Sequence, residues 1–310
     1  MGERAKKIGE KLEGYGSNLF SNIGWKEILR DKEIKCSRSA SHGKKTHGID
    51  ILFKVQNPYM KQIQGIVVEC KNRQMESITC TEIEKWIKEL AGTIQCAQSS
   101  SELNDYDAQL DGVIINSGLL LIHANNGFDK EKFVQALTSV KPPRMRAELN
   151  LFVAGNNYIY QWDALFRKIS ADYPQLSFLY PSIDGYNQKS LPHITINYLF
   201  SKYIFATRSD SRQAGSNTYT IKQVFMFIFD TVSTETFLYA WDMFKAYQLQ
   251  SYDEYVFVFY PRNSDDIVYI KESFFDTLKN ADCNFDADCQ KKSKYDIIDN
   301  RMLSPVDTMR

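Results

Sequence analysis

Two stretches of the sequence decide the fold: HGIDILF at residues 47–53 and GIVVECKN at residues 65–72. Each is a short apolar run that is rich in β-branched residues and typical of a buried strand. A turn-forming Asn-Pro-Tyr segment at residues 57–59 lies between them, so the two runs are expected to form an antiparallel hairpin. A hairpin centred near this turn places Asp50 beside Glu69.

The two carboxylates and a nearby lysine indicate a metal site. Side chains alternate along a strand, so Glu69 and Lys71 share one face while Cys70 lies on the other. Asp50 and Glu69 repel each other in a partly buried site unless a divalent cation neutralises them, and oxygen ligands with space for water suit Mg²⁺. Bound Mg²⁺ stabilises charge on phosphoryl oxygens and acidifies its water, while the lysine can orient or deprotonate that water. Hydrolysis of a phosphodiester bond requires this combination.

The order of these residues resembles that of the PD-(D/E)xK, or restriction-endonuclease-like, nucleases, in which a helix precedes a strand bearing Asp and a strand bearing Glu-x-Lys. The resemblance covers only the first half of the chain. It implies that Asp50, Glu69 and the Cys70 carbonyl hold Mg²⁺, which Mn²⁺ can replace. It also implies that Lys71 positions the attacking water and that Glu10, in the first helix, contacts a metal-bound water. The sequence departs from the family pattern because no proline precedes Asp50.

The same residues allow other interpretations. A Glu-x-Lys motif is a weak signal by itself, and a second copy at residues 33–35 lies in a charged segment with no carboxylate strand before it. Glu69 and Lys71 could form a salt bridge at a sheet edge, with Asp50 capping a turn. A nuclease fold that binds nucleic acid without cleaving it is the intermediate case.

The remaining pattern of the first half predicts a restriction-endonuclease-like mixed sheet flanked by helices. Apolar residues at helical spacing predict a first helix over residues 3–23, which carries Glu10 and its alternative Glu13. Thr81 and Glu84 form a capping box, so a helix is expected over residues 82–96. The other expected elements are strands at residues 112–116 and 119–124 and a helix at residues 130–137.

Pro142 and Pro143 mark the expected domain boundary, because neither helix nor sheet continues easily through two prolines. The expected domains are a nuclease domain at residues 1–143, a second α/β domain at 144–279 and a polar, loosely packed C-terminal tail at 280–310. Strands that are apolar on both faces predict a βαβ unit over residues 222–260. The remaining predicted elements of this half are strands at residues 149–153, 176–179 and 193–205 and a helix at residues 158–169.

The charge distribution makes the first half the candidate for nucleic-acid binding. The whole chain carries 38 basic and 38 acidic residues and has no net charge. Residues 1–145 nevertheless carry 21 basic against 18 acidic residues, whereas residues 146–310 carry 17 against 20. Polar and basic residues close to the Asp50 and Glu69 strands either contact phosphates or belong to solvated loops and turns: Lys44, Lys45, His47, Asn72 and Arg73.

The composition excludes several classes of protein. Hydrophobic residues at 43% and charged residues at 25% are typical of a globular chain and exclude a disordered or coiled-coil one. No apolar run approaches the ~18 residues that cross a bilayer, and the charged N-terminus has no signal-peptide core, so we expect a cytoplasmic protein with no membrane partner. The six cysteines include no CxxC pair, which argues against a disulfide scaffold or a zinc ribbon.

Together these features predict a Mg²⁺-dependent nuclease that cleaves DNA. The alternatives are an RNase acting through the same residues and a non-catalytic DNA-binding or interaction subunit. The slightly acidic second domain is expected to dock a partner protein or a second copy of the chain. The segment GERAKKIGEKLEGYG at residues 2–16 and the attached second half also resemble the nuclease subunit of two-gene bacterial anti-phage defence systems, which implies a partner subunit.

Overall fold

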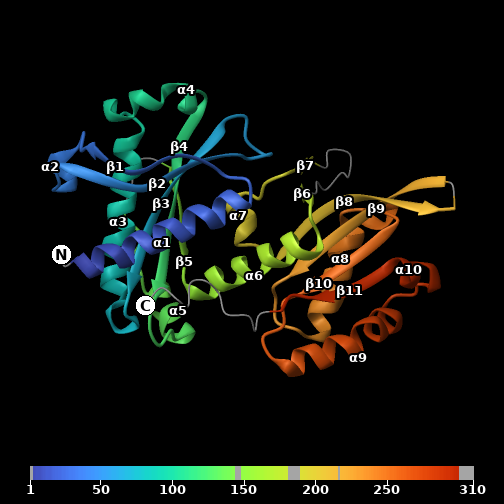
Figure 1. Cartoon of the computed structure of the whole chain (residues 1–310). Helices are drawn as coiled ribbons and strands as arrows, with labels where there is room; N and C mark the ends of the chain where they lie inside the picture. Colours follow the sequence, from blue (N-terminus) through green and yellow to red (C-terminus); the bar gives the residue numbers. More distant parts are fainter. Residues whose placement is uncertain (1–2, 144–147, 181–188, 216, 300–310) are drawn as a thin grey trace. The chain divides into compact units, whose positions relative to one another are not determined.

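The computed structural model describes residues 3–143, 148–180, 189–215 and 217–299 (Figure 1). Contacts divide these residues into two compact units, the first ending at Asp163 and the second beginning at Ala164. Each unit contains one β-sheet with helices packed on it, as expected for an α/β chain. Within the described ranges, none of the helices combines the length and the apolar character needed to span a bilayer.

A five-stranded mixed sheet with the order β1-β2-β3-β4-β5 forms the centre of the first unit. β2 is antiparallel to both β1 and β3, whereas β4 runs parallel to both β3 and β5. The expected hairpin is confirmed, with β2 and β3 paired in the predicted register. The strand bounds are β1 Lys26–Lys35, β2 Thr46–Gln56, β3 Ile63–Arg73, β4 Val113–Ala124 and β5 Asn150–Ala154.

The two long helices of the first unit, α1 and α3, cover opposite faces of this sheet. Leu121 of β4 lies beside Gly16 of α1, whereas Gly118, an odd number of residues earlier, faces α3. A Cβ atom on Gly118 would lie 2.6 Å from Ile94 Cδ1 and 2.9 Å from Leu90 Cδ2, so glycine is needed for α3 to approach β4 this closely. The helices are α1 Glu3–Asn22, α2 Ser39–His42, α3 Cys80–Ala97, α4 Asp107–Leu110 and α5 Lys130–Thr138, with 3₁₀ turns η1 Met75–Ser77 and η2 Ser101–Tyr106.

Two elements of the first unit differ in detail from the sequence-based expectation. α3 begins earlier than expected because Thr79, not Thr81, caps it: the Thr79 side chain accepts a hydrogen bond from the backbone N–H of Glu82. β4 is one continuous strand where two were expected, since Ser117 and Gly118 remain paired with β3. The expected helices at residues 3–23 and 130–137 are confirmed as α1 and α5.

The two edge strands of the first sheet, β1 and β5, differ from the sequence-based expectation. β1 has the charged sequence KEILRDKEIK and was not expected from the sequence. β5 corresponds to the strand expected after the proline pair, but it pairs in parallel with β4 and is the last strand of the first sheet. The contacts therefore divide the chain after Asp163, later than Pro142 and Pro143. Residues 144–147 lie outside the described ranges.

A six-stranded sheet with the order β11-β10-β9-β8-β6-β7 forms the centre of the second unit. The expected βαβ unit is confirmed as β9-α8-β10, because β9 and β10 pair in parallel with α8 between them. Aromatic side chains of α8 and α9 pack on one face of these strands, and Phe225 on the other face lies against Tyr173, with ring centroids 4.7 Å apart. The strand bounds are β6 Ser177–Tyr180, β7 Lys189–Leu191, β8 Tyr203–Ala214, β9 Asn217–Ile228, β10 Glu254–Phe259 and β11 Ser293–Ile297, and the helices are α7 Ile196–Leu199, α8 Thr234–Ala246, η3 Leu249–Ser251, α9 Ser264–Ala281 and α10 Ala287–Lys292. The division between the units falls within α6 Asn156–Asp172.

Two expectations for the second unit were wrong. The single strand expected over residues 193–205 is instead α7 followed by the start of β8, because Thr195 caps a short helix by accepting a hydrogen bond from the Tyr198 backbone N–H. The chain after residue 280 is not a loosely packed tail as far as it is described, since β11 pairs in parallel with β10 along its whole length. β11 therefore closes one edge of the sheet.

Candidate active site

The hairpin of β2 and β3 brings Asp50 and Glu69 together. The strand register pairs Ile51 with Val68, and the next step along both strands places Asp50 opposite Glu69. The backbone N–H of Cys70 donates a hydrogen bond to Asp50 Oδ2 at 2.7 Å, which fixes the carboxylate against β3. The register therefore gives the juxtaposition that the sequence predicted.

Lys71 completes the group by donating a hydrogen bond from its Nζ to Glu69 Oε1. The Glu69 side chain is only 12% exposed and that of Lys71 only 15% exposed, so the ion pair is largely shielded from water. Burial opposes the charge of Lys71, but the nearby carboxylates of Glu69 and Asp50 outweigh it and raise the pKa of the lysine above its ordinary value. Lys71 is therefore an ammonium group near neutral pH, suited to donating hydrogen bonds and not to accepting a proton.

The two carboxylates are destabilised as anions. Burial raises the pKa of Glu69 to about 7, the charge of Asp50 adds to this rise, and Lys71 opposes it. Burial also raises the pKa of Asp50, against the opposing effects of the Cys70 N–H and the Lys71 ammonium. A largely shielded pair of hard oxygen donors with too little positive charge beside it fits a divalent cation such as Mg²⁺. The family resemblance implies the Cys70 carbonyl as a third donor.

A third carboxylate that interacts electrostatically with the pair comes from α1, and it belongs to Glu13. The pKa of Glu13 is raised to about 7. Burial is the largest cause, and the negative charges of nearby carboxylates add to it, in the order Asp50, Asp31, Glu10 and Glu69. Glu13 is half-buried, whereas Glu10, one turn earlier on α1, is exposed. The contact of α1 with β3 near Gly16 brings the turn that carries Glu13 toward the hairpin.

The sequence-based reasoning missed Asp31. It lies opposite Asp50 in the register of β1 and β2, and its charge raises the pKa values of both Asp50 and Glu13. Asp31 has a φ of 48°, a left-handed conformation that aspartate tolerates better than most residues. Because β1 was not predicted, no signal in the sequence could place Asp31 near Asp50.

Arg30 of β1 is engaged by other side chains. Arg30 Nη2 lies 2.8 Å from Glu27 Oε2 and also donates a hydrogen bond to Ser17 of α1. Glu27 in turn accepts a hydrogen bond from the Ser17 hydroxyl, so the three side chains form one group that joins β1 to α1. The charge of Arg30 is therefore largely balanced by Glu27, and Lys71 is the cation in direct contact with the carboxylate pair.

Two of the predicted phosphate contacts lie on the connection between β1 and β2. Lys44 forms an ion pair with Glu89 of α3, with 2.8 Å between Nζ and Oε1. Lys45 is exposed at the end of this connection, before β2 begins. Contact with nucleic acid stays a prediction for both residues.

The other three predicted contacts differ in exposure. His47 is only 5% exposed and points toward α3, and Asn72 is 5% exposed with its Oδ1 atom 3.2 Å from His123 Nδ1. Arg73 is exposed at the end of β3, where its Nη1 donates to the carbonyl of Asn72 at 3.0 Å. Contact with nucleic acid stays a prediction for all three, and Arg73 is the one that lies at the surface.

A comparison with protein families agrees with the fold of the first unit. The family model of the GAPS4 protein PD-(D/E)XK nuclease domain matches residues 1–158, which include the whole five-stranded sheet and the residues Asp50, Glu69 and Lys71. A search of curated proteins gave no match. The family match spans half of the chain, and the chain belongs to the GAPS4 family of PD-(D/E)XK nuclease domains.

Proposed function

We propose that this chain is a Mg²⁺-dependent nuclease that hydrolyses phosphodiester bonds in DNA, and that it acts in the cytoplasm as part of a two-component anti-phage defence system. One observation carries the catalytic part of this proposal: half-buried Asp50 lies beside buried Glu69, and the Lys71 ammonium is bonded to Glu69. Such a pair is costly for the fold without a ligand, and a divalent cation is the ligand that removes the cost. The family match and its defence-associated name support the same function.

Different residues of the site have different roles in the proposed reaction. Asp50, Glu69 and the Cys70 carbonyl would hold the cation, and Mn²⁺ could replace Mg²⁺ in this set of oxygen donors. When bound, the cation supplies positive charge to the phosphoryl oxygens and lowers the pKa of a water ligand. Lys71 remains protonated, so it orients the water or a phosphate oxygen by donating a hydrogen bond.

Glu13 is the better placed of the two α1 glutamates to accept the proton of the attacking water. Its pKa of about 7 suits a general base at neutral pH, since such a group is partly ionised and still basic. Glu10 is exposed one turn away and adds negative charge near Glu13. In this proposal Glu10 contacts a metal-bound water, and Glu13 takes the proton.

Cleavage assays on several substrates test the proposal. The full chain, with and without a partner subunit, is incubated with plasmid, linear DNA and tRNA in Mg²⁺ or in EDTA. We expect cleavage of DNA in Mg²⁺ only, lost in Asp50→Asn and Glu69→Gln. Glu33→Gln is the matched control, because Glu33 belongs to the other Glu-x-Lys sequence and is exposed on β1.

Two other outcomes would overturn parts of the proposal. Cleavage of tRNA but not of DNA would identify an RNase that uses the same residues. Equal phage protection in cells by wild type and Asp50→Asn would indicate a non-catalytic subunit, in which the second unit docks a partner or a second copy of the chain.

A further inference from the structure

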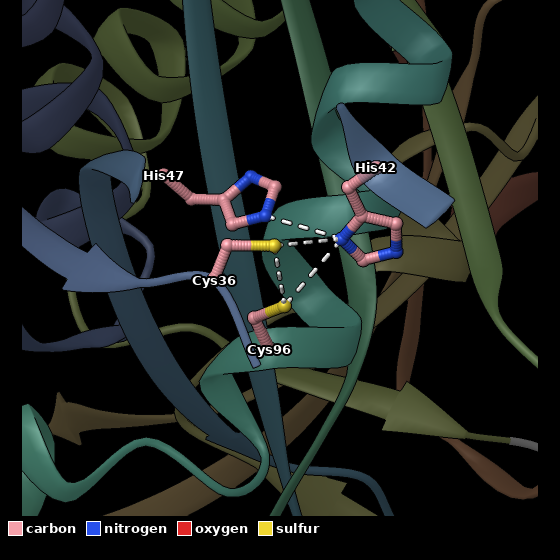
Figure 2. A group of neighbouring side chains, drawn as sticks. All are labelled: Cys36, His42, His47 and Cys96. Atoms are coloured by element: carbon pink, nitrogen blue, oxygen red, sulfur yellow. Dashed lines mark hydrogen bonds between the residues drawn. The ribbon is translucent and has the colours of Figure 1, made fainter. Parts of the chain in front are cut away.

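A second group of metal-binding side chains lies away from the carboxylates. Cys36 follows β1, His42 ends α2, His47 lies in β2 and Cys96 lies in the last turn of α3 (Figure 2). One ligand atom from each residue lies within 4.8 Å of all the others. We propose that these four residues bind one zinc ion, which holds the connection between β1 and β2 onto α3.

The distances between the ligand atoms match a tetrahedral zinc site. With Zn–S of about 2.3 Å and Zn–N of about 2.05 Å, a regular tetrahedron has S···S, N···S and N···N edges of about 3.8, 3.6 and 3.3 Å. The Sγ atoms of Cys36 and Cys96 are 3.8 Å apart, and His42 Nδ1 lies 3.3 Å and 3.6 Å from them. His42 Nδ1 and His47 Nε2 are 3.2 Å apart. Two sulfur and two nitrogen ligands in this geometry favour zinc over Mg²⁺.

Neighbouring polar groups hold both histidine rings with a ligand nitrogen turned inward. His42 Nε2 lies 3.1 Å from Gln95 Oε1, which leaves Nδ1 for the metal. His47 Nδ1 lies 3.5 Å from Thr93 Oγ1, which leaves Nε2. Zinc-binding histidines characteristically donate their other ring N–H to such an oxygen, and this fixes the tautomer. The same contacts explain why His47 is buried, which favours a ligand over a phosphate contact for this residue.

The surroundings are those of a closed structural site. Cys96 and His47 are buried, and all four ligands come from the protein, which leaves no position for a substrate. The Cys36 N–H donates to the Lys45 carbonyl at 2.9 Å and closes the loop that carries His42. Gly92 leaves space for the imidazole, because a Cβ atom there would lie 3.2 Å from His47 Cε1. The site ties this loop to α3 at the start of β2, the strand that carries Asp50.

Metal content is the direct test. The full chain is expressed in medium with zinc, purified without chelators, and analysed for zinc and for chain concentration. We expect one zinc per chain in the wild type and in Cys283→Ser, an exposed cysteine outside the cluster that serves as the control. Cys96→Ser and His47→Ala lose the zinc. His42→Cys retains it, since a thiolate replaces one nitrogen ligand, and this variant separates loss of a ligand from loss of the fold.

Cobalt gives a second readout on the same protein. Co²⁺ exchanged into the wild type is expected to show the visible and thiolate charge-transfer absorption of a tetrahedral site, and Cys36→Ser is expected to lose the charge-transfer intensity. Wild type without zinc, or Cys96→Ser with full zinc, would overturn the proposal. Intact-mass measurement showing a Cys36–Cys96 disulfide in place of the metal would overturn it as well. Glu69→Gln keeps its zinc, so the outcome is independent of nuclease activity.

Discussion

The largely shielded carboxylate pair makes the stability of the first unit depend on pH and on divalent cations. A carboxyl group whose pKa is higher in the folded than in the unfolded chain holds its proton more tightly when folded. For Glu69, full stability is present below its ordinary pKa of 4.5 and is lost as the pH rises to about 7. We expect the metal-free first unit to lose stability across this range, and Glu69→Gln to remove most of the loss.

The size of this loss of stability follows from the shift in the pKa of Glu69. Each unit of pKa corresponds to about 1.4 kcal/mol, so the rise of the Glu69 pKa from 4.5 to about 7 costs the ionised form about 3 kcal/mol. Glutamine has the shape of the protonated acid and carries no charge. At pH 8 in EDTA, the first unit of Glu69→Gln is therefore expected to be about 3 kcal/mol more stable than that of the wild type.

Hydrogen exchange measures this difference without requiring the whole chain to unfold in one step. The amides of Ile51 and Val68 in the paired strands report on opening of the first unit, after correction for the intrinsic exchange rate at each pH. Mg²⁺ is expected to restore the protection of the wild type at pH 8 and to have little effect on Glu69→Gln. Glu33→Gln is the control and behaves as the wild type. Protection in EDTA that stays constant from pH 5 to pH 8 would refute the reasoning.

Three further predictions concern single residues. Lys71→Met is expected to abolish cleavage and to keep the stabilisation by Mg²⁺, as measured by nuclease assay and hydrogen exchange; retained cleavage would remove the lysine from the mechanism. Glu13→Gln is expected to reduce cleavage more than Glu10→Gln and to flatten the rise of the rate with pH near 7, and the opposite ranking would return the role to Glu10. Gly118→Val is expected to destabilise the first unit by about 1–3 kcal/mol, because its Cβ would collide with side chains of α3; an unchanged thermal midpoint would contradict the close approach.

The sequence predicted the centre of the first unit because local signals specify it. The hairpin follows from two apolar runs and a turn, and its register places Asp50 with Glu69. β1 escaped prediction because it is an edge strand, where charged side chains face water and weaken the apolar pattern. With β1 missing, Asp31 could not be placed opposite Asp50.

The features that the sequence did not predict depend on contacts between segments that are distant in the sequence. The choice between Glu10 and Glu13 is set by the rotation of α1 on the sheet, which helical spacing leaves open within one turn. The zinc cluster combines His42 and His47, which are close in sequence, with Cys96, which reaches them only when α3 docks. No sequence spacing encodes such a set, and the absence of a CxxC pair pointed away from zinc.

The contact between Lys71 and Glu69 has a consequence for how the proposed catalytic site would be switched on. The lysine is an internal counter-ion: its ammonium is bonded to the Glu69 oxygen that faces it. A divalent ion held by this oxygen would compete with the ammonium for its negative charge, so a tethered monovalent cation and a free divalent one would share or contest the same acceptor. An ammonium whose bond to Glu69 weakened would have a hydrogen-bond donor to offer to a phosphate oxygen. In the structure, that donor is held by Glu69.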